Sequence, residues 1–132
     1  MNFLPRTAEE WDRITRQFQI HPYRWLNKRE LTTLVSLRVP TYVITPDAKY
    51  PHAIAYPAHL ARTGPFASSF DYMMALAIWE GFQSILITGV DYRKGTLREQ
   101  LCEHVSLAYW VGKARGWGIK VEIGPGSLLQ FP

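Results

Sequence analysis

The feature that most constrains the fold is a short run of apolar and β-branched residues, Ser84-Ile-Leu-Ile-Thr-Gly-Val-Asp91. Long helix-like segments lie on both sides of it. Such runs are typical of strands buried on both faces, and these strands belong to parallel sheets covered by helices. Ligands of these sheets bind just beyond the carboxyl ends of the strands. The run therefore predicts a fold class and a site near Gly89 and Asp91.

Hydrophobic spacing, caps and proline positions predict the remaining elements. Helices are expected at residues 7–19, 27–37, 68–81 and 96–115, and strands at residues 41–45, 85–90 and 119–123, with a short edge strand at 53–56. The helix at 68–81 is apolar nearly all round, so we expect it to be buried on several sides. The last helix has an apolar stripe that we expect to face the core. The stripe consists of Leu97, Leu101, Val105, Ala108, Val111 and Gly112.

Helix and strand alternate in the second half of the chain, and right-handed crossovers make such strands parallel. We therefore predict an α/β fold, a small three-layer Rossmann-like parallel sheet of three to four strands flanked by helices. Residues 41–45, 85–90 and 119–123 should be adjacent strands. The length of 132 residues suits a single domain. In this prediction, residues 1–38 form a helical N-terminal segment and residues 39–132 form the sheet with its helices.

Charge and cysteine content restrict the partners. The net charge of +4 suits a small anionic ligand or a nucleotide, but no run of basic residues exceeds two, which disfavours nucleic acid. Cys102 is alone, so the chain has no intramolecular disulfide and is compatible with a reducing cytosol. No apolar run reaches the length of a membrane span, so no membrane association is expected.

Three segments together resemble a known group of proteins. They are Ser68-Ser-Phe-x-Tyr-Met-x-Ala-Leu-Ala-Ile-x-Glu-Gly-Phe82, Ile85 to Asp91, and Tyr109-Trp-Val-Gly-x-Ala-x-Gly-x-Gly-Ile-x-Val121. This pattern resembles small phage and prophage proteins, which are similar to the 6-hydroxymethylpterin diphosphokinase-like family and to motility-associated glycosyltransferase-like proteins. The resemblance covers roughly residues 37 to 129. It implies a Rossmann-like fold that binds a nucleotide or phosphate, pyrophosphoryl or glycosyl transfer, and a place in the host cytoplasm or the virion.

The segment before the apolar helix is a candidate anion site. Free N–H groups in the first turn of a helix attract anions, and the hydroxyls of Ser68 and Ser69 are placed to join them. The alternative is a capping box, in which Ser68 pairs with Asp71 three residues later. Asp71 would also repel a phosphate.

The segment after the central strand holds the other candidates. Asp91 is placed to hold magnesium on a nucleotide diphosphate or to bind a ribose, and Gly89 gives a ligand room to approach. Alternatively, Asp91 caps its own turn. Arg93 and Lys94 either contact phosphates or are solvated surface charges. Asp47 follows the strand at 41–45, and a Thr-Pro-Asp turn explains it equally well.

Two hypotheses on function remain open. The first is a nucleotide- or nucleotide-sugar-binding Rossmann-like domain of phage or prophage type, with or without transferase activity. The second is a non-catalytic phage structural or assembly module that forms homo-oligomers or binds an assembly partner. The family relatives open with a strand and a Gly-Pro-Ser turn, whereas the first glycine here is Gly64. That difference favours the second hypothesis.

Overall fold

A computed structural model describes residues 7–36, 39–93 and 95–130. The chain groups into two compact units, Met1–Ala58 and His59–Pro132. Both units mix helices with small parallel sheets, which shows α/β character. The single domain over residues 1–132 stays a prediction.

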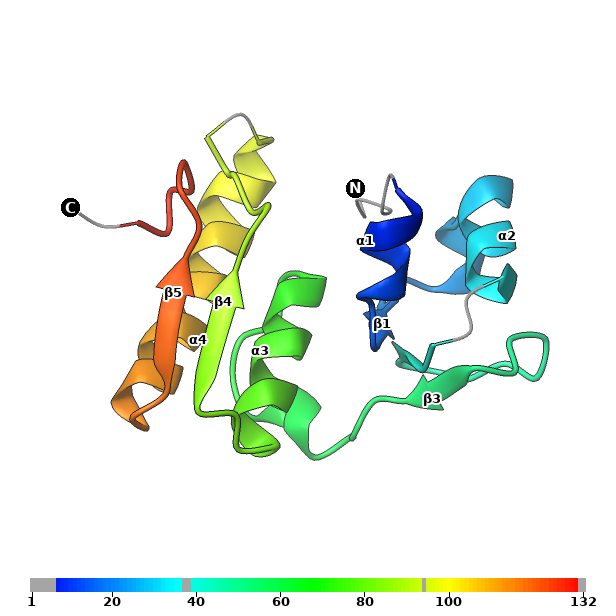
Figure 1. Ribbon diagram of the computed structural model, residues 1–132, viewed down its shortest axis with the longest axis horizontal. Helices are drawn as coiled ribbons and strands as arrows, with labels where there is room; N and C mark the ends of the chain where they lie inside the picture. Colours follow the sequence, from blue (N-terminus) through cyan, green and yellow to red (C-terminus); the bar gives the residue numbers. More distant parts are fainter. Residues whose placement is uncertain (1–6, 37–38, 94, 131–132) are drawn as a thin grey trace. The chain divides into compact units, whose positions relative to one another are not determined.

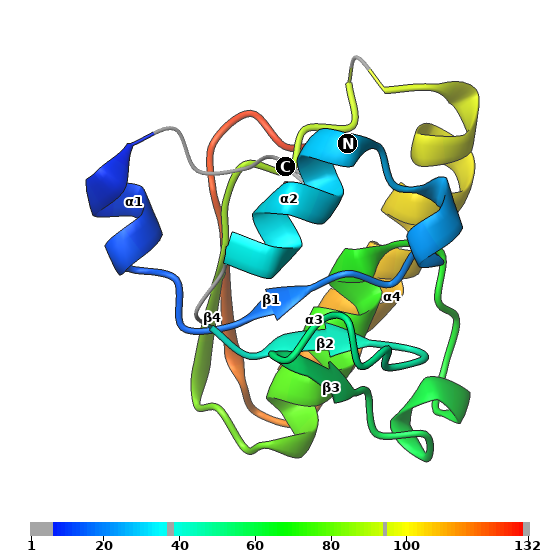
Figure 2. The same cartoon turned by 90° about the vertical axis from the view of Figure 1, so that its right-hand side faces the viewer.

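The first unit is built around a parallel sheet in the order β1-β2-β3 (Figure 2). Its described elements are α1 (Ala8–Asp12), β1 (Gln17–Phe18), the 3-10 helix η1 (Tyr23–Trp25), α2 (Lys28–Ser36), β2 (Thr41–Val43) and β3 (Ala53–Ala55). β2 is the central strand, and both Thr41 and Val43 are buried. α2 has the predicted cap, in which Asn27 and Glu30 each accept a hydrogen bond from the backbone N–H of the other.

The predicted helix over residues 7–19 is wrong beyond Asp12, because Gln17 and Phe18 form β1 instead. The backbone N–H of Gln17 donates to Pro40 O and that of Gln19 donates to Tyr42 O, both over 2.9 Å. The ring of Phe18 stacks on Tyr42 with 5.0 Å between centroids. Pairing with a distant strand has overridden a local helical pattern.

The second unit contains a parallel pair of strands with two long helices on one face (Figures 1 and 2). Its described elements are the 3-10 helix η2 (Leu60–Arg62), α3 (Ser69–Trp79), β4 (Ser84–Ile87), the π-helix η3 (Glu99–Glu103), α4 (His104–Gly116) and β5 (Lys120–Ile123). The strands pair in the predicted parallel direction. Ile87 and Val121 point into the core, whereas Leu86 stays 65% exposed on the opposite face.

The structure corrects the predicted sheet in two ways. β2 does not pair with β4, because each edge of β2 already pairs with another strand, β1 or β3. β4 is not buried on both faces, since Ser84 and Leu86 are exposed. The described residues thus form two small parallel sheets.

The core of the second unit lies between its strands and helices α3 and α4. Leu107, Trp110 and Ala114 of α4 are at most 1% exposed, and Met74 and Ala75 of α3 pack with them. The predicted inner stripe is therefore wrong at its N-terminal end. Leu97, Leu101 and Val105 are 59–70% exposed. The helix turns a different side towards the core.

Candidate functional site at the carboxyl end of β4

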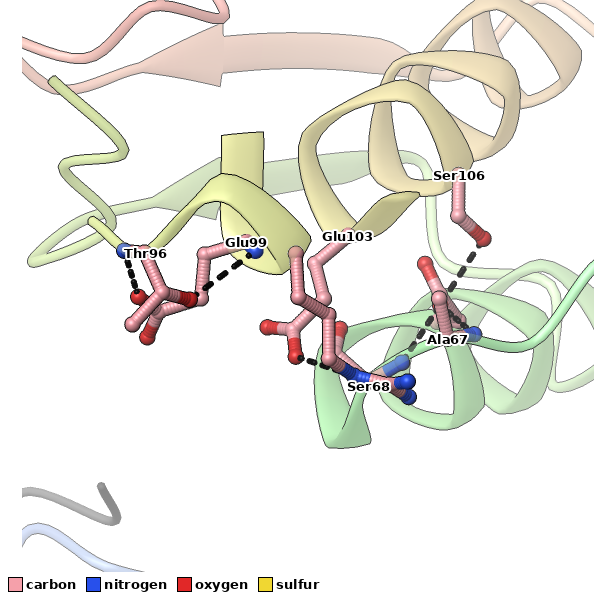
Figure 3. Close-up of polar contacts among 8 residues, drawn as sticks. Ala67, Ser68, Thr96, Glu99, Glu103 and Ser106 are labelled. Atoms are coloured by element: carbon pink, nitrogen blue, oxygen red, sulfur yellow. Dashed lines mark hydrogen bonds and ion pairs between the residues drawn. The ribbon is translucent and has the colours of Figure 1, made fainter. Parts of the chain in front are cut away.

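Helix α3 begins with the capping box that the sequence offered as one alternative. The N–H groups of Ala67 and Ser68 donate to Asp71 Oδ2 over 2.6 and 2.9 Å (Figure 3). A third donor to this oxygen is Ser106 Oγ of α4, at 2.9 Å. A side-chain carboxylate thus occupies the place where the sequence suggested a ligand anion.

Asp71 is fully buried, and only one of its two carboxylate oxygens accepts hydrogen bonds. Burial raises the pKa of Asp71 above its ordinary value, although the hydrogen bonds from Ala67, Ser68 and Ser106 oppose the shift. All three donors use Oδ2, while Oδ1 has no hydrogen-bond partner. An unpaired oxygen at a buried carboxylate is costly to the fold.

Tyr92 brings the loop after β4 to this cap. It is 5% exposed, and its hydroxyl has no hydrogen bond of good geometry. Burial raises the pKa of Tyr92 strongly, with a further contribution from the charges of Glu103 and Asp71, while the neighbouring Ser68 hydroxyl lowers it. Tyr92 is therefore protonated at neutral pH.

Three polar atoms in this region are buried without a full partner: Ser68 Oγ, Asp71 Oδ1 and Tyr92 Oη. Ser68 Oγ occupies the capping-box position beside the Asp71 N–H, but the contact lacks good hydrogen-bond geometry. Most buried polar atoms in proteins are paired, so three near one helix end need an explanation. The group offers acceptors and rotatable hydroxyl donors to a further molecule.

The start of the next helix adds carboxylates to the same region. Glu103 is close enough to Asp71 for the charge of Asp71 to act on it, and its Oε1 is 3.9 Å from Arg98 Nε. Burial and the charge of Glu99 raise the pKa of Glu103, which Arg98 partly offsets. Glu99 itself caps its helix by accepting the Thr96 N–H over 2.5 Å. The surroundings are acidic, which disfavours a phosphate next to Asp71.

Among the other predicted site residues, Gly89, Asp91 and Arg93 are exposed. Asp91 is exposed and accepts the N–H of Arg93 at Oδ1 over 2.9 Å, as in the Asx-type turn named as its alternative role. Arg93 is exposed. Gly89 has a φ of 73°, which few side chains would tolerate, and Lys94 lies outside the described residues. Ser69 is half-buried in the first turn of α3.

The sequence analysis assigned no role to Tyr92, Glu103 or Ser106. One signal for Tyr92 was present, because Val90 and Tyr92 alternate in the sequence with the charged Asp91 and Arg93, and the structure buries the first pair and exposes the second. This alternation has the period of two of a strand, but it is shifted by one residue from that of β4, since Ile87 and Val90 are buried and Gly89 is exposed. For Ser106 the helical pattern gave no such signal.

A cavity in the first unit also lies at the ends of parallel strands. It has a volume of about 320 Å³ and is lined by segments that directly follow β1 and β2, residues 19–23 and 43–47. Asp47, which the sequence placed at a strand end, is part of its wall. The hydroxyl of Tyr23 is buried there without a hydrogen bond of good geometry.

Nowhere in the described residues do three or more His, Cys, Asp or Glu side chains gather in a way that could hold a metal ion. Over the same residues, every helix is too short or too polar to cross a membrane. Comparison of the chain with known protein families, with curated proteins and with solved structures gave no match.

Proposed function

We propose that the chain is a nucleotide- or nucleotide-sugar-binding Rossmann-like module of phage or prophage type, with its site at the carboxyl end of β4. The observation that carries this proposal is the group of buried oxygens on Ser68, Asp71 and Tyr92 that have no hydrogen bond of good geometry. They belong to the first turn of a helix and to the loop that follows a parallel strand. Ligands of parallel sheets bind in this position.

The chemistry of the group favours the hydroxyls of a ribose or sugar over a phosphate. Asp71 already accepts the backbone N–H groups of Ala67 and Ser68, and its carboxylate would repel an anion at this end of the helix. Ser68 Oγ and Tyr92 Oη can donate or accept, and Asp71 Oδ1 can accept, which matches neighbouring hydroxyl groups. Because the three oxygens are enclosed, a ligand reaches them only after neighbouring side chains move.

The charged end of the ligand would lie further out. In this proposal, the exposed Arg93 contacts the diphosphate and Asp91 holds its magnesium through the carboxylate oxygen that is not bound to Arg93 N–H. A transfer reaction would use these residues for positioning and charge stabilisation.

Isothermal titration with nucleoside diphosphates and their sugars in magnesium buffer tests the proposal. Tyr92→Phe should weaken binding about tenfold, since one hydrogen bond to a buried group is lost. It should not lower the stability of the protein, because the buried hydroxyl has no hydrogen bond of good geometry in the free protein. Tyr109→Phe, on the exposed side of α4, is the matched control. Absence of heat at millimolar ligand would contradict the proposal. Release of nucleoside diphosphate from a bound sugar donor tests the transferase part.

The second candidate function is a non-catalytic assembly module, and the exposed side of the last helix favours it. Leu97, Leu101, Val105 and Tyr109 recur every four residues and are 45–70% exposed. Such a stripe lies along one side of a helix and is suited to pack against another protein surface. In this case the parent should self-associate in sedimentation velocity and Leu101→Glu should not. A clean monomer at micromolar concentration would argue against it.

A further inference from the structure

We infer that the first unit binds a small organic amine in the crevice at the carboxyl ends of β1 and β2. This site is separate from the one proposed around Ser68. The crevice volume of about 320 Å³ falls within the range of small-molecule pockets. Its walls come from the segments that leave two adjacent parallel strands, a common position for ligand sites.

The charges of the lining select against anions. Asp47 is the acidic side chain of the wall, and none of the described residues that line the crevice is Lys or Arg. Among the residues of the wall, His21 is the one with a basic side chain, and it is exposed. A nucleotide phosphate would meet the Asp47 carboxylate without a fixed cation to balance it. A protonated amine would instead form a charge-assisted hydrogen bond with that carboxylate.

The geometry around Asp47 leaves acceptors for such an amine. Asp47 Oδ1 accepts the N–H of Lys49 over 2.9 Å, so the other carboxylate oxygen remains to accept a bond. The Tyr23 hydroxyl is a second acceptor beside Asp47, because it is buried and contacts the Asp47 backbone only in poor hydrogen-bond geometry. Burial and the charge of Asp47 raise the pKa of Tyr23, and the contact with the Asp47 backbone partly opposes this shift.

The remaining walls suit a flat apolar body behind the amine. Pro22, Ile44 and Pro46 supply apolar surface around the carboxylate. The ring of Tyr23 is held in place by stacking on Tyr50 with centroids 4.3 Å apart. A cation near such a ring gains a further attraction from its π-electrons. The crevice therefore combines one charged acceptor with an aromatic and apolar surround.

A series of three probes of matched size tests this inference. Phenethylamine, 2-phenylethanol and 3-phenylpropanoate differ only in the head group, which is cationic, neutral or anionic. In an NMR titration of the whole ¹⁵N-labelled chain, phenethylamine should give saturable shifts at Ile20, Ile44 and Thr45. The alcohol should bind about tenfold more weakly, because its hydrogen bond to the carboxylate is not charge-assisted. The carboxylate should not bind. Equal affinity for the three probes, or shifts away from the crevice, would overturn the inference.

Variants then locate the charge that selects the amine. Asp47→Asn keeps an oxygen for the Lys49 N–H and should lower amine affinity about tenfold, to that of the alcohol. Tyr23→Phe should lower it by a smaller factor. Asp12→Asn makes the same change of charge on α1 of the same unit, outside the crevice, and should leave the affinity unchanged. Amine binding that survives both Asp47→Asn and Tyr23→Phe would sink the assignment, whatever the outcome of the nucleotide titrations.

Discussion

The two sides of the last helix differ in a way that the sequence does not reveal. One side carries Leu107, Trp110 and Ala114, which are at most 1% exposed. The other carries Leu97, Leu101 and Val105, which are mostly exposed. Both sets follow helical spacing, so either could have been the inner face. The choice depends on what each side meets in three dimensions.

A polar contact and a local distortion help to set the orientation. Trp110 Nε1 donates to Pro65 O over 2.7 Å, which ties the helix to the segment before α3. The Trp110 ring also lies so close to Gly64 that a Cβ there would be 2.9 Å from it. The π-helical turn η3 precedes α4 and shifts the face that each following residue presents. The spacing of apolar residues along the helix predicts neither this hydrogen bond, nor the close approach to Gly64, nor the π-helical turn.

The comparison of the two sides predicts one large and one small effect. Leu107→Asp should abolish folding, because an unpaired buried carboxylate costs several kcal/mol, while a whole domain is stable by about 5–15 kcal/mol. Val105→Asp should change the free energy of unfolding by less than about 0.5 kcal/mol, as is usual at exposed sites. Circular dichroism during urea unfolding checks both variants. Two equally folded variants would refute the assignment of the inner face.

The parts of the fold that the sequence predicted are those decided by local signals. The Asn27–Glu30 cap, the helix at α3 and the parallel pairing of β4 with β5 follow from capping residues and crossover handedness. β1 could not be predicted in this way, since Phe18 forms a strand only because it meets Tyr42. The lack of pairing between β2 and β4 likewise depends on β1 and β3, which occupy both edges of β2.

Asp71 and Asp91 give a second contrast between inside and outside. Asp71→Ala would leave the N–H groups of Ala67 and Ser68 without their acceptor, and the Ser106 hydroxyl would keep only its other acceptor, Pro65 O. The expected loss is about 3 kcal/mol, since an unsatisfied buried donor costs about 1–3 kcal/mol. Asp91→Ala removes one exposed hydrogen bond and should cost about 0.5–1 kcal/mol. Urea titrations of the two variants measure the difference. Equal losses would show that the carboxylate of Asp71 is not the centre of this cap.

The sequence predicted where the candidate site lies better than it predicted which residues form it. The sequence placed Ser68 and the end of β4 near each other, and the structure brings the Ser68 hydroxyl close to Tyr92. It also offered the capping box and the Asx-type turn as alternative roles for Ser68 and Asp91, and both are present. Ser106 could not be foreseen, because its contact with Asp71 joins residues 35 positions apart. Local pattern specifies caps, whereas a buried polar group is assembled by packing.

The buried carboxyl of Asp71 should also make the stability of the protein depend on pH, and Asp71→Asn should remove this dependence. Its pKa is raised in the folded protein, so the native state binds its proton more tightly than the unfolded state does. The stabilisation from this proton is complete below the unfolded pKa and is lost as pH rises through the folded pKa.

The Asp71→Asn variant has no carboxyl group that titrates. The oxygen of its side-chain amide can still accept the N–H groups, and the amide NH₂ group takes the position of Oδ1, which has no partner in the parent. The variant should therefore gain stability relative to the parent as pH rises from about 3 to about 8. Glu103, whose pKa is also raised, is the same in both proteins and largely cancels in the difference. Urea unfolding of the pair across this range gives the sign directly, and a difference that stays flat or falls with pH would show that Asp71 titrates normally.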